Sequence, residues 1–322
     1  MSKPSTTDQE FIELWHKLGS PQLMSEQLGV GVRNICDRRA RLEKKLGINL
    51  DTHNDLRYGN RAPTITHSFD RVRSIANLEG YVFVFSDAHF QPNESTPAFF
   101  ALLKLIKKLK PVAIIANGDI LDGGTISKYG PEDWSERPTL QQELEAVQIH
   151  MDAIVKACKG LGTILHRTIG NHCIRFDKRL ANAAPEFKGI KGTTLSDHIQ
   201  EWTVSWSVMV NDNTMIKHRM QHSGIHSAYN NTLKGGINTV TGHTHLLEVK
   251  PWGDYKGRRY GVSTGMLADP SSGAFRYIED NPVPWCQGFA ILSFDTDGRL
   301  LPPELVEVIE GVPYFRGQKI EV

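Results

Sequence analysis

The hydrophobic pattern of the first 50 residues predicts three short helices. Apolar residues recur at helical spacing between Phe11 and Leu18. Ser20 and Pro21 favour a helix start at the segment PQLMSEQL. Two glycines, at positions 29 and 31, then mark a turn before a third helix, VRNICDRRARLEKKLGI. Because a helix, a glycine turn and a helix after an opening helix form the helix-turn-helix pattern, we predict a helix-turn-helix-like all-α domain over residues 1–50.

The next interval, residues 51–79, lacks a clear hydrophobic period. It is polar and is broken by glycine and proline. These features predict a linker, with room for one short strand. A regular pattern begins at residue 80, so we place the second domain at residues 80–322.

From residue 80 onward, buried strands and amphipathic helices alternate. Residues 81–85 form a short apolar run, which predicts a strand buried on both faces. The segment PAFFALLKLIKKLK carries apolar residues on one face and lysines on the other, as in a helix that packs on a sheet. The strand VAIIANGD, a helix over residues 139–159 and the strand GTILHRTIGNH follow. This repetition predicts a parallel sheet with helices on its faces.

The second half of this domain is richer in β-structure. TVSWSVMV and TMIKH flank Asn211, Asp212 and Asn213, which favours a hairpin. INTVTGHTH is a further apolar strand, and GRRYGVST, QGFAILSFD and ELVEVIE are predicted to complete a second sheet. The predicted fold class is therefore α/β, with two sheets packed face to face and covered by helices.

Potential metal ligands follow several of these strands at their carboxyl ends, which border the ligand crevice in open α/β sheets. Glycines in the same segments, Gly118, Gly170 and Gly242, allow close approach of the backbone. Asp, His and Asn ligands without a thiolate favour Mn, Fe or Zn over Ca or Mg, and we expect Mn. Two divalent cations about 4 Å apart need a bridging ligand, for which a carboxylate is suited. The candidate residues are Asp87, His89, Asp119, Asn171, His172, His243 and His245, with His218 as a further candidate.

The segments DAH, NGD and GNH, an isolated histidine and GHTH occur in this order and resemble the signature of the calcineurin-like metallophosphoesterases. The resemblance extends over residues 80–310 and implies a four-layer α/β/β/α sandwich with two metal ions. It implies that His172 is the general acid that protonates the leaving oxygen. Asp119 would bridge the two metals. The other ligands that the resemblance implies are Asp87, His89 and His245 for one metal and Asn171, His218 and His243 for the other.

Two positions complicate the transfer of the family pattern. The isolated histidine is either His218 or His222. We favour His218 because it directly follows the strand TMIK, which leaves His222, together with Arg175, as a substrate-binding candidate. Cys173 follows the GNH segment, where many members of the family carry an acidic residue that supports the histidine. This difference leaves the orientation and the pKa of His172 open.

The net charge of the chain is +1, so any argument for a polyanionic partner has to be local. The third predicted helix supplies such an argument, because its basic side chains could reach DNA phosphates and some base edges. The alternative is a docking domain with a solvated basic face. The candidate DNA-contacting residues are Arg33, Arg38, Arg39, Arg41 and Lys45.

Cysteine usage and hydropathy indicate the compartment. Four cysteines without a CxxC pair fit a reducing cytoplasm and argue against a disulfide framework. The N-terminus lacks the apolar core of a signal peptide, and no segment approaches the ~18 apolar residues of a membrane span. We therefore expect a cytoplasmic protein with no membrane partner. The layout also resembles phosphoesterases encoded by bacteriophages, for which the compartment would be the host cytoplasm.

Three hypotheses of function follow. The first is a two-metal phosphodiesterase, a DNA nuclease that uses a metal-activated hydroxide and contacts DNA through its N-terminal helices. The second is a phosphatase or a small- or cyclic-nucleotide phosphodiesterase in which these helices are an assembly module. The third is a DNA-binding protein without catalytic turnover. The oligomeric state stays open, with a homodimer as one alternative, because helix-turn-helix units often bind DNA as dimers.

Overall fold

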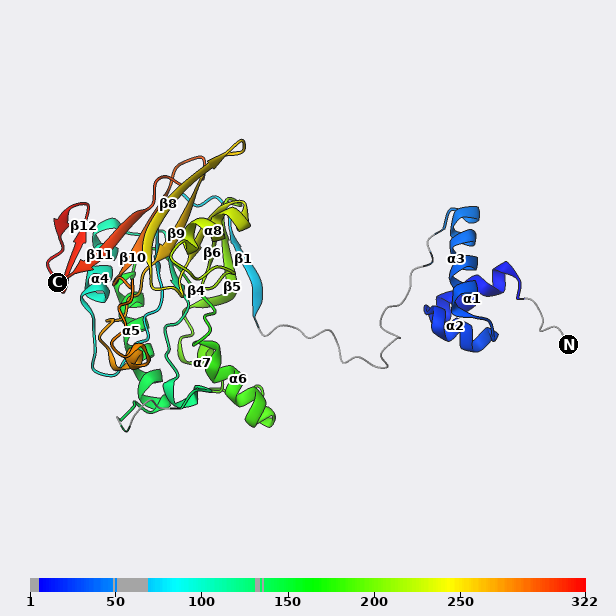
Figure 1. The fold of residues 1–322 in the computed structure, drawn as a ribbon, viewed down its shortest axis with the longest axis horizontal. Coiled ribbons are helices and arrows are strands. Elements are labelled where there is room, and N and C mark those ends of the chain that lie inside the picture. The colour runs from blue at the N-terminus through cyan, green and yellow to red at the C-terminus, as the bar shows by residue number, and fades with distance from the viewer. Residues whose placement is uncertain (1–5, 49, 51–68, 131–133, 135) are drawn as a thin grey trace. The chain divides into compact units, whose positions relative to one another are not determined.

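The computed structural model describes residues 6–48, 50, 69–130, 134 and 136–322 (Figure 1). The chain divides into two compact units, Met1–Ser68 and Phe69–Val322. Of the interval predicted as a linker, residues 51–68 lie outside the described residues. Strand β1 (Asp70–Ile75) belongs to the second unit, because it pairs in parallel with β5 (Thr203–Val210). The predicted linker therefore overlaps the second unit.

Three helices form the N-terminal unit, as predicted: α1 (Asp8–Leu18), α2 (Pro21–Leu28) and α3 (Val32–Leu46). Thr7 caps α1 in a capping box with Glu10, and the Ser20 side chain caps α2. Gly29 ends α2 with a left-handed φ of 65°, which a glycine adopts without strain. The core of this unit consists of Phe11, Trp15, Met24, Ile35, Leu42 and Leu50.

The second unit is built on one hydrogen-bonded ladder, which has 13 strands in the described part of the chain. Its order is β13-β12-β11-β10-β2-β3-β4-β5-β6-β7-β9-β8, with β1 also paired to β5. Strands β2 to β5 are parallel, and β10 to β13 pair antiparallel. The other strands are β2 (Gly80–Phe85), β3 (Ala113–Asn117), β4 (Ile164–Thr168), β6 (Thr214–Lys217), β7 (Asn238–Thr241), β8 (Leu247–Asp254), β9 (Gly257–Thr264), β10 (Gly288–Phe294), β11 (Glu304–Ile309), β12 (Val312–Phe315) and β13 (Gln318–Lys319).

Helices cover this ladder and connect its strands (Figure 1). None of those in the described residues combines the length and the hydrophobicity that a membrane-spanning helix needs. The α-helices are α4 (Pro97–Leu109), α5 (Leu140–Ala157), α6 (Ile174–Ala183), α7 (Leu195–His198) and α8 (Ser227–Gly235), and the 3₁₀ helices are η2 (Gly124–Ile126), η3 (Pro185–Phe187) and η4 (Gly273–Ile278).

The ladder folds back so that its two halves face each other. Val82 and Val84, on one face of β2, share a hydrophobic core with Val240 of β7 and Val262 of β9. Phe83, on the opposite face of β2, packs in a second core with residues of α4 and α5. Helix α8 lies against β7, β8 and β9 on the other outer side. The predicted four-layer α/β/β/α arrangement is therefore confirmed.

The distribution of strands between the two halves differs from the prediction. β10 pairs with β2, since Ala290 lies opposite Val84 and Leu292 opposite Val82 in an antiparallel register, and β11 pairs with the other edge of β10. The sequence had placed these strands in the second sheet. Because β10 is buried on both faces, its continuous apolar run carries no information about which strand is its neighbour.

The carboxyl ends of strands from both halves supply the loops of the candidate site. In one half, β2, β3 and β4 end at Phe85, Asn117 and Thr168, and in the other β6 and β7 end at Lys217 and Thr241. The loops that leave these ends converge, because the two halves are stacked on a shared core. The fold thus gathers five segments that are distant in the sequence.

The buried side chain of His166 predicts a pH-dependent stability. Its ring lies between Thr203 Oγ1 (2.6 Å) and Ser205 Oγ (2.8 Å), and burial, together with the charges of Arg73 and Arg167, lowers its pKa to about 4. An unfolded histidine takes up a proton near pH 6.5, whereas the folded one does not until about pH 4. Stability should therefore fall as the pH drops through this window, by up to about 3 kcal/mol from this residue.

Urea unfolding of the chain in a chelator at pH 7 and pH 4.5 measures this effect. His166→Gln should show a smaller loss of unfolding free energy between the two pH values than the unmodified chain. His16→Gln, at an exposed position, is the control and should leave the loss unchanged. An equal pH dependence in all three proteins would contradict the assignment.

Candidate metal centre

The predicted metal ligands and His172 all lie in the loops that follow strands. Two of these loops are bonded together: Asp87 N–H donates to Gly118 O (3.1 Å) and His89 N–H donates to Asp119 O (3.0 Å). Because β2 and β3 are adjacent parallel strands, the loops that follow them place Asp87 and Asp119 side by side. Asp87 and His89 follow β2, Asp119 follows β3, Asn171 and His172 follow β4, His218 follows β6, and His243 and His245 follow β7.

The backbone at five of these positions is left-handed. The φ angles are 50° at Asp87, 38° at His89, 51° at Asp119, 71° at His243 and 59° at His245. Residues other than glycine rarely adopt this region, and such positions cluster at functional sites where the surrounding structure enforces them. Here the chain turns sharply at the end of a strand, which directs the side chains toward one centre.

The three glycines noted in the sequence are needed for close packing around the acids. A Cβ atom at Gly170 would clash with the carboxylate of Asp119. A Cβ at Gly118 would lie 2.5 Å from the ring of His218, and one at Gly242 would lie 2.6 Å from Ser86 Oγ. A side chain would not fit at any of the three positions, so the prediction of close backbone approach is confirmed at all three.

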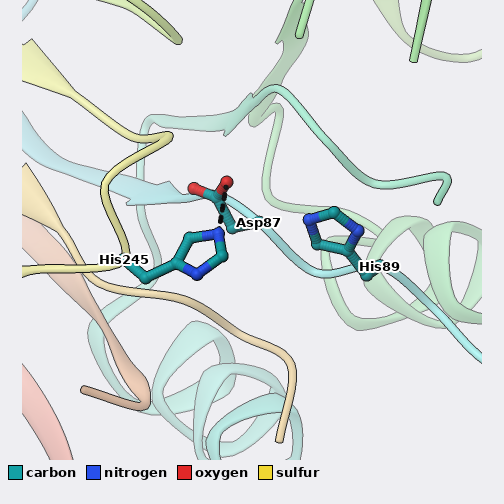
Figure 2. Close-up of side chains that lie close together, drawn as sticks. All are labelled: Asp87, His89 and His245. Carbon is teal, nitrogen blue, oxygen red and sulfur yellow. Dashed lines mark ion pairs between the residues drawn. The ribbon is translucent and has the colours of Figure 1, made fainter. Parts of the chain in front are cut away.

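Asp87, His89 and His245 form one group of potential ligands (Figure 2). One ligand atom from each lies within 4.8 Å of the others. The His245 ring is turned toward the carboxylate, with Nε2 at 3.2 Å from Asp87 Oδ1. The second carboxylate oxygen of Asp87 accepts hydrogen bonds from the Ser86 hydroxyl and from the backbone N–H of His243 (2.8 Å).

Asp119, His218 and His243 form another group within the same distance limit. His218 Nε2 lies 2.9 Å from Asp119 Oδ2, and its Nδ1 donates to the backbone oxygen of Asn117 (2.8 Å). Asp119 Oδ1 accepts from the backbone N–H of His172 (2.8 Å). The structure thus brings His218, and not His222, to Asp119.

The surroundings of both buried acids favour the ionised form. Burial raises the pKa of Asp87 and of Asp119, but the neighbouring charge of His218 outweighs it and holds both values well below the usual range. Conversely, burial lowers the pKa of His218, yet the two carboxylates raise it to about 9. His243 is affected differently, because burial and the charge of His218 lower its pKa to about 4.

Buried ligand atoms without a hydrogen-bond partner coincide with the predicted ligand set. Among the described residues, ten buried side-chain nitrogen or oxygen atoms have no such partner, and half of them belong to this set. An unpaired buried polar atom costs about 1–3 kcal/mol, so a cation that satisfies several at once is strongly favoured. The residues present therefore fit divalent metal ions. Two of these atoms, Asp87 Oδ1 and His218 Nε2, still lie in the contacts with His245 and Asp119 described above. The other three are His89 Nε2, Asn171 Oδ1 and His245 Nδ1.

Asp122 is a site residue that sequence reasoning missed. Its Oδ1 accepts from Nδ1 of both His172 (2.9 Å) and His89 (3.1 Å), and these bonds keep its pKa low in spite of burial. Arg175 donates to the backbone oxygen of Asp122 (2.9 Å), and its Nη2 lies 3.2 Å from His172 Nε2. The orientation of His172, left open by Cys173, is thus fixed by Asp122. Its position three residues after Asp119, in NGDILD, was the available signal.

Two buried groups hold the loop that carries Asp122. Glu143, on α5, accepts from the backbone N–H groups of Gly123 (2.6 Å) and Gly124 (3.2 Å), and burial together with the charge of Asp122 raises its pKa to about 7. Cys173 Sγ accepts from the backbone N–H of Ile120 (3.3 Å), and burial raises the pKa of this thiol to about 11. Cys173 is therefore a packing residue of the site.

The remaining candidates lie elsewhere. His222 has an exposed side chain and takes part in none of these groups, while its backbone N–H and carbonyl bond to Asn231. In the N-terminal unit, Arg38 and Lys45 both contact Asp8, at 3.1 and 3.3 Å. Arg39 pairs with Glu43 at 3.5 Å. Arg33 and Arg41 are exposed, and neither forms an ion pair with a described residue.

A cleft of about 890 Å³ opens beside the metal-ligand groups. Asp122, Asn171, His172 and Arg175 form part of its wall. Its size is that of a small-molecule site and exceeds what a phosphate group alone requires. A substrate in this cleft would meet His172, so the cleft is the candidate substrate site.

Comparison with known proteins agrees with the geometry. The family model of the calcineurin-like phosphoesterases matches residues 80–247, slightly more than half of the chain. The Gene 54 protein of Mycobacterium phage D29 is 23% identical over 252 residues, which cover 71% of this chain and 94% of that protein. The Gene 54 protein of Mycobacterium phage L5 is 28% identical over 97 residues, which cover 29% of this chain and only 36% of that protein.

Among solved structures, an archaeal phosphodiesterase matches 71% of this chain and 99% of its own, with 14% identity and a TM-score of 0.35. The assignment rests on the family match, which spans the segments that carry Asp87, Asp119, His172, His218 and His245. This chain belongs to the calcineurin-like phosphoesterase family.

Proposed function

We propose that this protein is a two-metal phosphodiesterase that hydrolyses DNA. The observation that carries the proposal is the coincidence of orphaned ligand atoms in two neighbouring groups with an oriented histidine, His172, in the wall of the adjoining cleft. Two cations and a proton donor are what the cleavage of an anionic phosphodiester requires, because charge must be neutralised and a leaving oxygen protonated.

The ligand set supports two metal positions. Asp87, His89 and His245 would hold one ion, Asn171, His218 and His243 would hold the other, and Asp119 would lie between them. The mixture of carboxylate, imidazole and amide ligands favours Mn, with Fe or Zn as alternatives. Bound cations would neutralise the phosphate charge and lower the pKa of an attacking water.

The protein's own contribution to the chemistry centres on His172. Asp122 accepts the Nδ1 proton of this ring, and Nε2 accepts a hydrogen bond from Arg175 (3.2 Å) in the wall of the cleft. When Arg175 turns from Nε2 to the phosphate of a substrate, Nε2 is free to take up a proton and to give it to the leaving oxygen. Arg175, next to Nε2, is in position to bind a non-bridging phosphate oxygen.

DNA is proposed as the substrate because of the basic surface of α3. Arg33 and Arg41 are exposed on this helix and are available for phosphate contacts, whereas Arg38, Arg39 and Lys45 are engaged within the unit. The N-terminal unit is therefore proposed to act as the helix-turn-helix module that binds DNA. Only the unengaged basic residues of α3 would contact the phosphates. A homodimer would place two such modules on one duplex.

One observation favours a second function, a small-nucleotide phosphodiesterase or phosphatase with the N-terminal helices as an assembly module. Val30, Val32, Leu46 and Ile48 are all exposed in the N-terminal unit, between 37% and 48% of their surface. Val30 and Val32 lie at the start of α3 and Leu46 and Ile48 at its end, so each pair is a small apolar surface that an assembly partner could cover. The two functions differ in whether DNA is cleaved at all.

The metal assignment predicts different outcomes at Asp119 and His172. Asp119→Ala should lose both bound metal and hydrolysis of bis-p-nitrophenyl phosphate, because the ligand between the two positions is gone. His172→Ala should keep its metal and lose about 10²- to 10⁴-fold in kcat, since only the proton donor is removed. Metal content by mass spectrometry and steady-state kinetics in Mn measure both, with Asp297→Ala, at an exposed turn, as the control. Turnover retained by Asp119→Ala would refute the bridging role.

The DNA assignment predicts a salt-dependent role for Arg33 and Arg41. The full-length double variant Arg33→Ala/Arg41→Ala should bind duplex DNA more weakly and show a slope of log Kd against log salt that is smaller by about 2. Cleavage of linear duplex and of circular single-stranded DNA should fall, while hydrolysis of the small diester stays unchanged. Lys107→Ala/Lys108→Ala, on exposed positions of α4, is the charge-matched control. Hydrolysis of the small diester without cleavage of either DNA would favour the second function.

A further inference from the structure

An aromatic wall lies beside one of the metal-ligand groups. Phe275, on η4, is buried and its ring lies 5.1 Å from that of His89 and 5.5 Å from that of His245. Trp285 contacts the ring of His245 at 4.4 Å and that of Phe275 at 5.4 Å. Aromatic rings thus pack against one side of the site histidines. In the sequence these rings follow the segment that the family model matches, residues 80–247.

Tyr277 extends this wall into the cleft. Its ring centroid lies 6.4 Å from that of Phe275 and 6.3 Å from that of Trp285, so the ring is supported on one side. Its side chain is nevertheless 52% exposed and lines the cleft together with His172 and Arg175. Partial burial and the carboxylates of Asp122 and Asp87 raise the pKa of its hydroxyl, which agrees with a position close to the reacting centre.

A supported, half-exposed aromatic ring next to an arginine is suited to a flat aromatic ligand. Nucleobases stack on such rings without regard to sequence, because every base has a π-face. The cleft of about 890 Å³ has room for a nucleoside in addition to a phosphate. A substrate such as a phosphoprotein or an alkyl phosphate would leave this ring without a partner.

We propose that Tyr277 is a specificity-determining residue that stacks on the nucleobase next to the scissile phosphate. The proposal rests on the phosphodiesterase function proposed above and assigns to Tyr277 the recognition of the nucleoside in its substrate. Because base faces are covered by neighbouring bases in duplex DNA, the base that Tyr277 takes has to be unstacked. The enzyme should accordingly prefer single strands, frayed ends or short nucleotides to the interior of a duplex.

Two substrates with the same leaving group test the proposal. Thymidine 5′-(p-nitrophenyl phosphate) and methyl p-nitrophenyl phosphate differ only in the nucleoside, so the ratio of their kcat/KM values reports recognition of that group. The full-length protein should favour the thymidine ester. Tyr277→Ala should reduce the ratio by about 5-fold to about 150-fold, the range for one base–aromatic stacking contact. Tyr277→Phe should retain the ratio, and Tyr255→Ala, at a fully exposed turn, should not change it.

Each outcome has a definite meaning. Loss of the ratio in Tyr277→Ala with rescue in Tyr277→Phe supports the stacking role. An equal loss of kcat/KM for both substrates in Tyr277→Ala, or a wild-type ratio near one, overturns it. A protein that discriminates between the two esters but cleaves no DNA would refute the nuclease function and leave the role of Tyr277 in place. Cleavage of DNA without discrimination between the esters would support the nuclease function and refute the role of Tyr277.

Discussion

The burial of two ionised carboxylates at the ends of β2 and β3 is the constraint on which the rest of the site depends. Asp87 and Asp119 are almost inaccessible to solvent, so each negative charge has to be balanced by protein groups or by cations. Backbone N–H groups of His243 and His172 supply part of the balance, and His218 supplies positive charge. The left-handed backbone and the close approach of glycines follow from the need to bring these groups together.

Much of this arrangement could be predicted from the sequence because its information is local. A buried parallel strand is recognisable as an apolar run, and the polar residue directly after it has only one edge of the sheet to occupy. His218 is an example, since it comes directly after β6, while His222 follows four residues later in an exposed loop. The glycines were equally local, because each stands beside the residue whose position it permits.

The parts that were missed depend on contacts between distant segments. The pairing of β10 with β2 joins residues about 200 positions apart, and the apolar pattern of β10 suits either half of the ladder. Glu143 reaches the loop after β3 from a helix, and Phe275 reaches His89 from a loop region without a period. The number of basic residues on α3 also overstated how many are available for DNA contacts, because Asp8 on α1 forms ion pairs with two of them. Sequence spacing alone cannot report such pairings.

The continuous ladder has a consequence for how the site responds to a substrate. The segments that carry Asp119 and His218 belong to different halves of the sandwich, but β4, β5 and β6 connect these halves through unbroken hydrogen bonding. Near the site, a bridge between Met266 and Gln287 ties the other ends of the two halves together. The two halves therefore cannot open by a hinge motion to admit a ligand. The continuous ladder therefore sets the spacing of the ligand groups. Selectivity among substrates has to come from the shape and the lining of the cleft.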